Sequence, residues 1–145
     1  MTIELATGDL LDAPVAALVN AVNCVGVMGK GIALQFKRRF PAMHAAYKAA
    51  CARGEVQIGR MFVVENVINF PTKQHWREPA QLAFVRDGLP ALIQEVRTRG
   101  IASIAVPALG CGAGGLAWRE VEPLIRDAFV ALPNVRVLLF APIMA

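Results

Sequence analysis

The sequence predicts a single α/β domain with a mixed, largely parallel sheet that helices cover on both faces. Its 145 residues are enough for one hydrophobic core but too few for two comfortable ones. Apolar residues make up 56% of the chain and charged residues 18%, which excludes intrinsic disorder as the main state. Apolar runs rich in β-branched residues alternate with helical patterns, as in parallel sheets with crossover helices. We therefore expect one domain over residues 1–145.

The strand predictions rest on four near-continuous apolar runs, at residues 17–22, 61–67, 101–106 and 135–140. Runs that do not alternate with polar residues are typical of strands covered on both faces. A weaker run at residues 3–6 predicts a first strand. In such sheets ligands lie beyond the carboxyl ends of the strands, so these ends are where we expect the functional residues.

Two helices are predicted after the strand at residues 17–22. One begins near Gly31 and ends before Pro41, because a proline cannot continue a helix. The other covers residues 42–52, where small and apolar residues dominate. Both helices would pack on the sheet before the chain enters its next strand.

Two further helices are predicted in the second half of the chain. Apolar residues at helical spacing run from Leu82 toward Gly100, which is a plausible C-terminal stop. Pro90 lies within this pattern and should kink or split the helix. The last apolar stripe, over residues 121–132, contains Pro123, which a helix accepts readily only in its first turn.

Charge, cysteine content and hydropathy exclude several classes of protein. Fifteen Lys and Arg against eleven Asp and Glu give a net charge of +4, compatible with a polyanionic partner without requiring one. The three cysteines (Cys24, Cys51 and Cys111) have no paired spacing, which indicates reduced thiols, and the two histidines are too far apart for a metal site. Pro107 and four glycines interrupt the uncharged stretch 101–118, so it is not a membrane span. We expect a cytoplasmic monomer without metal, cofactor or membrane association.

Two predicted strand ends lead into glycine-rich segments, at residues 23–33 and 107–116. Glycines let successive amides converge on an anionic oxygen, and the helix after Gly31 would add its dipole. Neither segment matches a Walker loop or a dinucleotide fingerprint. Two such segments in one small domain predict a phosphate-bearing ligand gripped from both sides. Tight turns that pack against helices are the alternative.

Three polar residues stand near predicted strand ends. Asn20 and Asn23 flank the end of an apolar strand, and their amides suit ribose hydroxyls because they both donate and accept hydrogen bonds. Asparagine also serves ordinary turn chemistry at strand ends. Asp9 follows the first strand, where it would accept a hydrogen bond from an exocyclic amine or cap a turn.

Four segments together give the sequence a family resemblance. They are Gly8-Asp9-Leu10, residues 18–33, the run Asn69-Phe-Pro-Thr-Lys-Gln-His-Trp-Arg77, and residues 107–116. Across essentially its whole length the sequence resembles the macro domain family, and within it the DarG-like branch of DNA ADP-ribosyl glycohydrolases, which are antitoxins. The run at 69–77 is the most specific element, since the glycine segments alone would indicate only the superfamily.

The resemblance implies a three-layer αβα sandwich that binds ADP-ribose. Asp9 matches the acid that recognises the adenine amine, and Phe140 matches the aromatic residue that stacks on adenine, with ordinary core packing as the alternative. Asn23 matches the asparagine at the distal ribose, with Asn20 in support. The expected ligand-binding residues are Asp9, Leu10, Asn20, Gly29, Lys30, Gly31, Ile32, Pro107, Gly110, Cys111, Gly112, Ala113, Gly114, Gly115, Leu116 and Phe140.

Lys73 is the expected catalytic residue, together with Asn23, because the lysine of this run is catalytic in the branch that the sequence resembles. A neutral amine near the distal ribose would attack the anomeric carbon or the opened aldehyde, and water would release the imine-like adduct. A solvated or phosphate-binding lysine is the alternative. Some relatives place an acid where this chain has Gly114, and other macro-domain hydrolases carry a glycine triplet where this chain has Lys30.

The residues after this lysine suggest the substrate. His75, Trp76 and Arg77 would stack on a base and touch a DNA phosphate, unless Trp76 only packs its loop. The basic cluster at 37–39 suits a solvated helix face or a nucleic-acid strand. The resemblance implies a hydrolase that removes ADP-ribose from thymidine in single-stranded DNA, with a cognate ADP-ribosyltransferase toxin as a candidate partner. The alternatives are a non-catalytic ADP-ribose reader, which would not need Lys73, and a hydrolase of protein-linked ADP-ribose.

Overall fold

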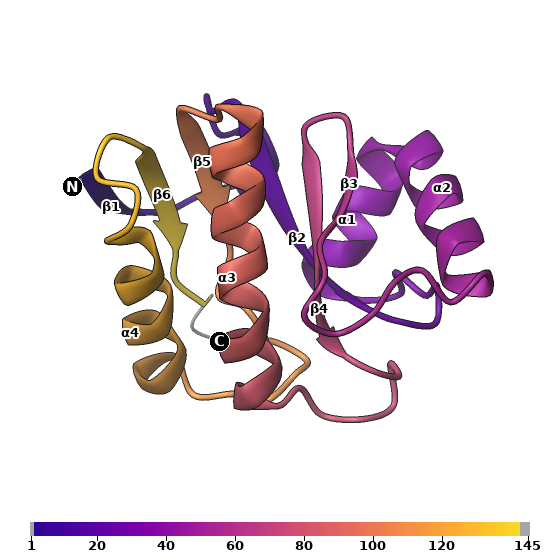
Figure 1. Ribbon diagram of the computed structural model, residues 1–145. Coiled ribbons are helices and arrows are strands. Elements are labelled where there is room, and N and C mark those ends of the chain that lie inside the picture. Colours follow the sequence, from indigo (N-terminus) through magenta and orange to yellow (C-terminus); the bar gives the residue numbers. More distant parts are fainter. Residues whose placement is uncertain (1, 143–145) are drawn as a thin grey trace.

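The computed structural model describes residues 2–142 (Figure 1). The strands are β1 (Thr2–Ala6), β2 (Ala17–Asn23), β3 (Phe62–Val64), β4 (Val67–Lys73), β5 (Ser103–Val106) and β6 (Arg136–Phe140). The α-helices are α1 (Gly31–Arg39), α2 (Pro41–Ala52), α3 (Leu82–Arg99) and α4 (Trp118–Phe129), and a 3-10 turn, η1, covers Leu10–Asp12.

The strands form one sheet in the order β1-β6-β5-β2-β4-β3. Every neighbouring pair is parallel except β3 and β4, so the predicted mixed, largely parallel sheet is confirmed. The five parallel strands all end on the same side of the sheet, which is the lower side for β4, β5 and β6 in Figure 1. We call this side the carboxyl edge; it is marked by Ala6, Asn23, Lys73, Val106 and Phe140.

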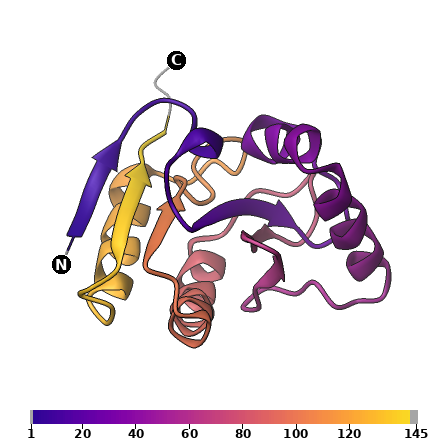
Figure 2. The same ribbon diagram turned by 90° about the horizontal axis from the view of Figure 1, so that it is seen from above.

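The sheet separates two apolar cores, which confirms the three-layer arrangement (Figure 2). On one face, α3 and α4 contribute buried residues such as Val85 and Ile125. On the other face, α1, α2 and η1 contribute Phe36, Tyr47 and Leu10. Because both faces are covered, β2 and β4 are almost continuously buried, as their apolar sequences predict. Within residues 2–142 no helix has the length and apolarity needed to cross a bilayer.

The predicted strand at residues 61–67 is wrong, because the structure has a hairpin there. β3 pairs antiparallel with the start of β4, and Glu65 turns the chain with a φ of 53°. β4 then continues to Lys73 through Pro71. Since β3 pairs with β4 only as far as Asn69, Pro71 lies where that side of β4 has no strand neighbour and its missing N–H leaves no ladder bond unmade. The apolar run crosses the turn, which is why the sequence pattern did not reveal it.

The two helix prolines also behave differently from expectation. α3 runs through Pro90 without being split, and α4 begins at Trp118, which places Pro123 beyond the first turn. The carbonyls that lose a helical partner belong to Arg86 and Arg119, which are both exposed, so water can satisfy them. Burial of each helix's apolar face outweighs the single lost hydrogen bond.

Candidate active site

The carboxyl edge brings together segments that are far apart in the sequence. Asp9 follows β1, the first glycine loop (residues 24–30) follows β2, and Lys73 ends β4. The second glycine loop (residues 107–116) follows β5, and Phe140 ends β6. Parallel pairing alone produces this convergence, because each of these strands delivers its last residue to the same edge.

Asn23 organises the first glycine loop. Its Oδ1 accepts hydrogen bonds from the backbone amides of Val25 at 3.0 Å and Val27 at 3.4 Å. Its Nδ2 donates to the carbonyl oxygen of Val27 at 2.7 Å. The residue is 7% exposed, and most of its hydrogen-bonding groups are used to hold the conformation of the loop. One Nδ2 proton is left over, since an amide nitrogen carries two.

Tyr47 holds Asn23 in place, and the sequence analysis missed it. The hydroxyl of this fully buried tyrosine lies 2.7 Å from the carbonyl oxygen of Asn23 and 2.9 Å from its Oδ1. Desolvation raises the pKa of Tyr47 far above its ordinary value, so the hydroxyl stays a donor at every physiological pH. It is the only tyrosine of the chain and shares a helical stripe with buried Met43 and Ala50, a signal that identifies a core position but not its hydrogen bonds.

Asn20 lies beneath the first glycine loop and not at its surface. The side chain is fully buried, and its Nδ2 donates to Oδ1 of Asn69 at 3.1 Å. Asn69 in turn donates to the carbonyl oxygen of Phe62 at 3.1 Å. The two asparagines face each other in the β2–β4 register, so their pairing fixes the neighbouring strands from which Asn23 and Lys73 emerge. Within residues 2–142 the Oδ1 of Asn20 has no hydrogen-bond partner.

The first glycine loop leads directly into α1. Gly29, Lys30 and Gly31 are all exposed, and Lys30 occupies the position before the first helical residue. Gly31 has a φ of 56°, a backbone conformation that favours glycine. Ile32 is half-buried against the core below. The free amides of the first helical turn therefore open toward the carboxyl edge.

The second glycine loop closes on itself through backbone hydrogen bonds of 2.9 to 3.2 Å. They run from Cys111 to Ala108, from Gly115 to Gly112 and from Leu116 to Gly110. The amides of Gly112, Ala113 and Gly114 donate to no protein atom within residues 2–142. Gly112 and Ala113 are exposed and Gly114 is buried, so two successive N–H groups are open to an anionic oxygen. Pro107 is buried where the loop leaves β5.

Gly114 can only be glycine in this loop. A Cβ at this position would lie 2.4 Å from the carbonyl oxygen of Gly110 and 2.8 Å from the Cβ of Ala80. The carbonyl of Gly114 also accepts a hydrogen bond from the Ala80 amide at 3.0 Å. The acid that some relatives are expected to carry here therefore does not fit this chain without a rearranged loop, whatever its charge would contribute.

Lys73 lies where the two glycine loops meet. It faces Asn23 in the β2–β4 register, next to an irregularity in the pairing at Val22 and Asn23. Its Nζ is 3.4 Å from the carbonyl oxygen of Ala113. The half-buried side chain therefore reaches from the end of β4 across to the second loop. A hydrogen bond from the Cys24 amide to the Gln74 carbonyl at 3.1 Å ties the first loop to the residues beyond the lysine.

The segment after Lys73 forms a partly aromatic rim. The Arg77 guanidinium lies 4.6 Å from the centre of the Trp76 ring, and the His75 and Trp76 ring centres are 5.5 Å apart. The Arg77 amide donates to Nδ1 of His75 at 3.1 Å. Trp76 is 43% exposed. In the first loop, Val25 is 45% exposed and Val27 is 40% exposed. Exposed apolar side chains therefore flank the lysine.

At the far end of the carboxyl edge, Asp9 caps a turn. Its Oδ1 accepts a hydrogen bond from the Leu11 amide at 3.0 Å, while its Oδ2 is 4.0 Å from the Arg39 guanidinium. Leu10 and Phe140 belong to the same core cluster and are 4% and 9% exposed. A hollow of about 410 Å³ beside this turn is lined by Asp9, Leu11, Gln35, Arg38 and Arg39.

Cys111 lies in the second glycine loop. Burial raises its pKa to about 11, so the thiol is protonated at neutral pH. Its Sγ lies 3.6 Å from the carbonyl oxygen of Leu109. A protonated thiol is a poor nucleophile.

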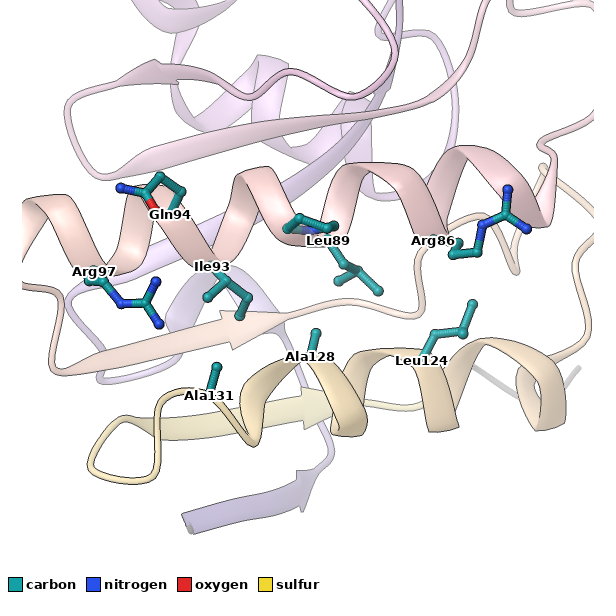
Figure 3. A pocket seen from close by; sticks show the side chains of 9 residues that line it. Arg86, Leu89, Ile93, Gln94, Arg97, Leu124, Ala128 and Ala131 are labelled. Carbon is teal, nitrogen blue, oxygen red and sulfur yellow. The ribbon is translucent and has the colours of Figure 1, made fainter.

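A second hollow, of about 480 Å³, lies between α3 and α4 (Figure 3). Its floor includes Leu89, Ile93 and Ala128, and Arg86 and Arg97 stand toward opposite ends. None of the expected site residues lines it. This groove belongs to the packing of two helices, whereas the expected residues gather at the carboxyl edge.

Known proteins share both the sequence and the fold of this chain. The Macro domain family matches residues 19–125. The DNA ADP-ribosyl glycohydrolase of Mycobacterium tuberculosis is 55% identical over 97% of this chain and 42% of its own length. The one from Thermus aquaticus is 51% identical over 94% of this chain and 40% of its own length. The chain thus spans about two fifths of the length of these curated relatives.

Solved structures agree with this match. The macrodomain of Mycobacterium tuberculosis DarG is 55% identical and superposes with a TM-score of 0.97, covering 98% of this chain and 99% of that one. Thermosipho africanus DarTG in complex with ADP-ribose is 32% identical with a TM-score of 0.90, covering 98% of this chain and 42% of that one. A curated relative from Thermosipho africanus, 32% identical over 85% of this chain and 38% of its own length, is a DNA ADP-ribosyl transferase-DNA ADP-ribosyl glycohydrolase fusion protein.

Proposed function

This chain belongs to the macro domain family, and on that premise we propose that it removes ADP-ribose from thymidine in single-stranded DNA. The observation that carries the proposal is the position of Lys73, whose amine contacts the Ala113 carbonyl at the junction of the two glycine loops. The glycohydrolase names of its relatives supply the reaction class and the DNA-linked substrate.

The diphosphate of ADP-ribose would lie between the two glycine loops. The exposed, unpaired amides of Gly112 and Ala113 would face the anion from one side. The first turn of α1, from Gly31, offers amides and the positive end of the helix dipole from the other. Backbone donors of this kind hold charge without a metal ligand set.

The adenine would occupy the far end of the edge, beside Asp9 and Phe140. Because Oδ1 of Asp9 already accepts the Leu11 amide, Oδ2 is the oxygen left to accept the exocyclic amine. Phe140 at the end of β6 and Leu10 in the η1 turn are almost fully buried, so only the edges of their side chains would underlie the adenine. This orientation places the distal ribose at the opposite end, next to Asn23 and Lys73.

Lys73 would act on the anomeric carbon of the distal ribose. The amine attacks this carbon, the bond to the thymine nitrogen breaks, and the base departs with the electron pair and takes up the proton that the amine loses. Ring opening of the resulting glycosylamine gives the imine that borohydride can reduce. Water then hydrolyses the lysine adduct, which releases ADP-ribose and regenerates the amine. The remaining Nδ2 proton of Asn23 would hold a ribose hydroxyl, so that the carbon faces the lysine.

The exposed rim would receive the nucleic acid. Trp76 offers an aromatic surface for a base, and Arg77 beside it offers a cation for a phosphate. His75 shapes this segment through its bond to the Arg77 amide. The fused transferase of the Thermosipho relative supports a cognate ADP-ribosyltransferase toxin as the partner whose product this protein would reverse.

The test is release of ADP-ribose from an oligonucleotide modified on thymidine. We expect turnover by the unchanged protein and its loss in Lys73→Ala. Lys73→Arg is the matched control, because it keeps the charge but not the nucleophile, and it should be equally inactive. Borohydride added during turnover should trap a mass increase on Lys73. Equal rates for all three proteins would remove this lysine from the mechanism.

A non-catalytic reader makes a different prediction for the same site. It would bind ADP-ribose through the glycine loops, Asp9 and Phe140, and Lys73→Ala would leave its function intact. Binding of ADP-ribose without turnover of DNA-linked or protein-linked ADP-ribose would establish the reader. Faster turnover of carboxylate-linked than of thymidine-linked ADP-ribose would instead identify a protein-directed hydrolase.

A further inference from the structure

Positive charge is concentrated in one part of the chain. Residues 13–54 hold six of the fifteen Lys and Arg residues and no Asp or Glu. The other nine cations share the rest of the chain with all eleven acids. The net charge of +4 is therefore a property of the first glycine loop, α1 and α2.

Most of these cations lack an acidic partner. Arg39 pairs with Asp12 at 3.1 Å, and Arg53 pairs with Glu55. Within residues 2–142, no carboxylate lies within 4.0 Å of the four remaining cations, which are Lys30, Lys37, Arg38 and Lys48. All four are exposed. A surface with several unpaired cations attracts a polyanion more strongly than a surface whose cations are all paired.

The three lysines among these four cations lie along one path from the first glycine loop. Lys30 stands at the start of α1. A Cβ on Gly26 of the loop would lie 3.4 Å from Cγ of Lys48, so Lys48 packs directly against the loop. His44 lies one helical turn before Lys48 on α2, so the two side chains share one face of that helix. Burial, followed by the charges of Lys37 and Lys48, lowers the pKa of His44. α1 and α2 lie side by side in Figure 1, so the path crosses both helices.

We propose that this lysine face (Lys30, Lys37 and Lys48, with His44) binds the phosphates of the single-stranded DNA that flanks the modified thymidine. The inference rests on the proposed function, because that function places the thymine at Lys73. The Cys24–Gln74 hydrogen bond makes the first glycine loop the immediate neighbour of this position. A strand leaving the site over that loop meets Lys48 first and Lys37 farther along.

The number of phosphates that the lysines neutralise sets how strongly salt should weaken oligonucleotide binding. Neutralising three phosphates of a single strand corresponds to a slope of about −2 in log affinity against log salt. The affinity for an oligonucleotide should therefore fall roughly 20-fold between 50 and 200 mM salt. Thymidine-linked ADP-ribose without flanking phosphates should show little of this dependence.

The experiment compares two substrates, a modified oligonucleotide and thymidine-linked ADP-ribose, in two charge variants of the full chain. Lys37→Glu/Lys48→Glu should lower kcat/KM for the oligonucleotide at least 10-fold and flatten its salt dependence. Its kcat/KM for the small substrate should stay within twofold of the unchanged protein. The matched control, Arg97→Glu/Arg99→Glu, makes the same charge change at the C-terminal end of α3 and should leave both substrates unaffected.

A binding measurement separates the two proposals. The pKa of His44 can be measured by NMR. It should rise when an unmodified oligothymidylate is titrated into the protein, because phosphates neutralise the two neighbouring lysines. This shift is expected even if the chain proves to be a reader without turnover. Turnover of the oligonucleotide by Lys37→Glu/Lys48→Glu at the unchanged rate, with no shift at His44, would overturn the lysine face and leave the proposed hydrolase intact. Binding of an acidic protein there without any effect of DNA would overturn it equally.

Discussion

Replacing Gly114 with alanine should destabilise the protein through one steric contact. The added Cβ would meet the Gly110 carbonyl oxygen at 2.4 Å, about 1 Å closer than an ordinary contact between such atoms. The obstacle is backbone, so no flexible side chain can move aside. Overpacking of this kind costs about 1–3 kcal/mol. For a domain of 145 residues this corresponds to a fall in Tm of roughly 3–9 °C.

Thermal denaturation and an ADP-ribose titration measure the effect, and Gly112→Ala is the matched control. A Cβ on Gly112 meets no atom within 4 Å, so its Tm should stay within about 1 °C of the unchanged protein. Gly114→Ala should also weaken ADP-ribose binding, because a loop shift of about 1 Å moves the exposed amides of Gly112 and Ala113. If Gly114→Ala melts at the same temperature as Gly112→Ala, the close packing of the second loop is not as described.

Three further predictions follow from single contacts. Tyr47→Phe removes the hydroxyl beside Asn23 and should cost about 1–2 kcal/mol in a denaturant titration, with weaker ADP-ribose binding; unchanged values would mean that the hydroxyl does not hold the loop. Burial raises the pKa of Cys111 to about 11, so few thiols are ionised at pH 7. The rate of its alkylation, measured by peptide mass spectrometry, should be low at pH 7 and rise about tenfold per pH unit up to pH 9.5. A rate independent of pH would contradict this. Gly88→Ala places a Cβ 2.6 Å from the Phe70 ring and should cost about 1–3 kcal/mol of unfolding free energy, so an unaltered Tm would contradict the tight packing of α3 on the sheet.

Much of the fold was readable because local patterns carried it. Apolar runs covered on both faces predicted the parallel strands, and the stripes of α3 and α4 predicted their buried faces. The hairpin of β3 and β4 was not readable, because its turn interrupts an apolar run without a glycine or proline. The helix prolines were misjudged for a related reason: the pattern shows the cost of a lost hydrogen bond but not the burial that offsets it.

The candidate site was also predictable only where local sequence patterns carry the information. The glycine segments and the run that contains Lys73 identified the family, and the comparisons confirmed it. Tyr47 could be read only as a core residue, because its partner lies 24 positions earlier in the chain. Asn20 was expected to support Asn23 at the distal ribose, yet it pairs with Asn69 beneath the loop, whereas Asn23 shapes the loop itself.

The sequence by itself determined the alternation of strands and helices, the two glycine segments and the family, because each is a local arrangement of residue types. Only the tertiary structure decided that Lys73 reaches Ala113 and that position 114 excludes every side chain. These facts depend on which strands pair and in what register, and pairing is settled by the burial of whole faces over long sequence separations.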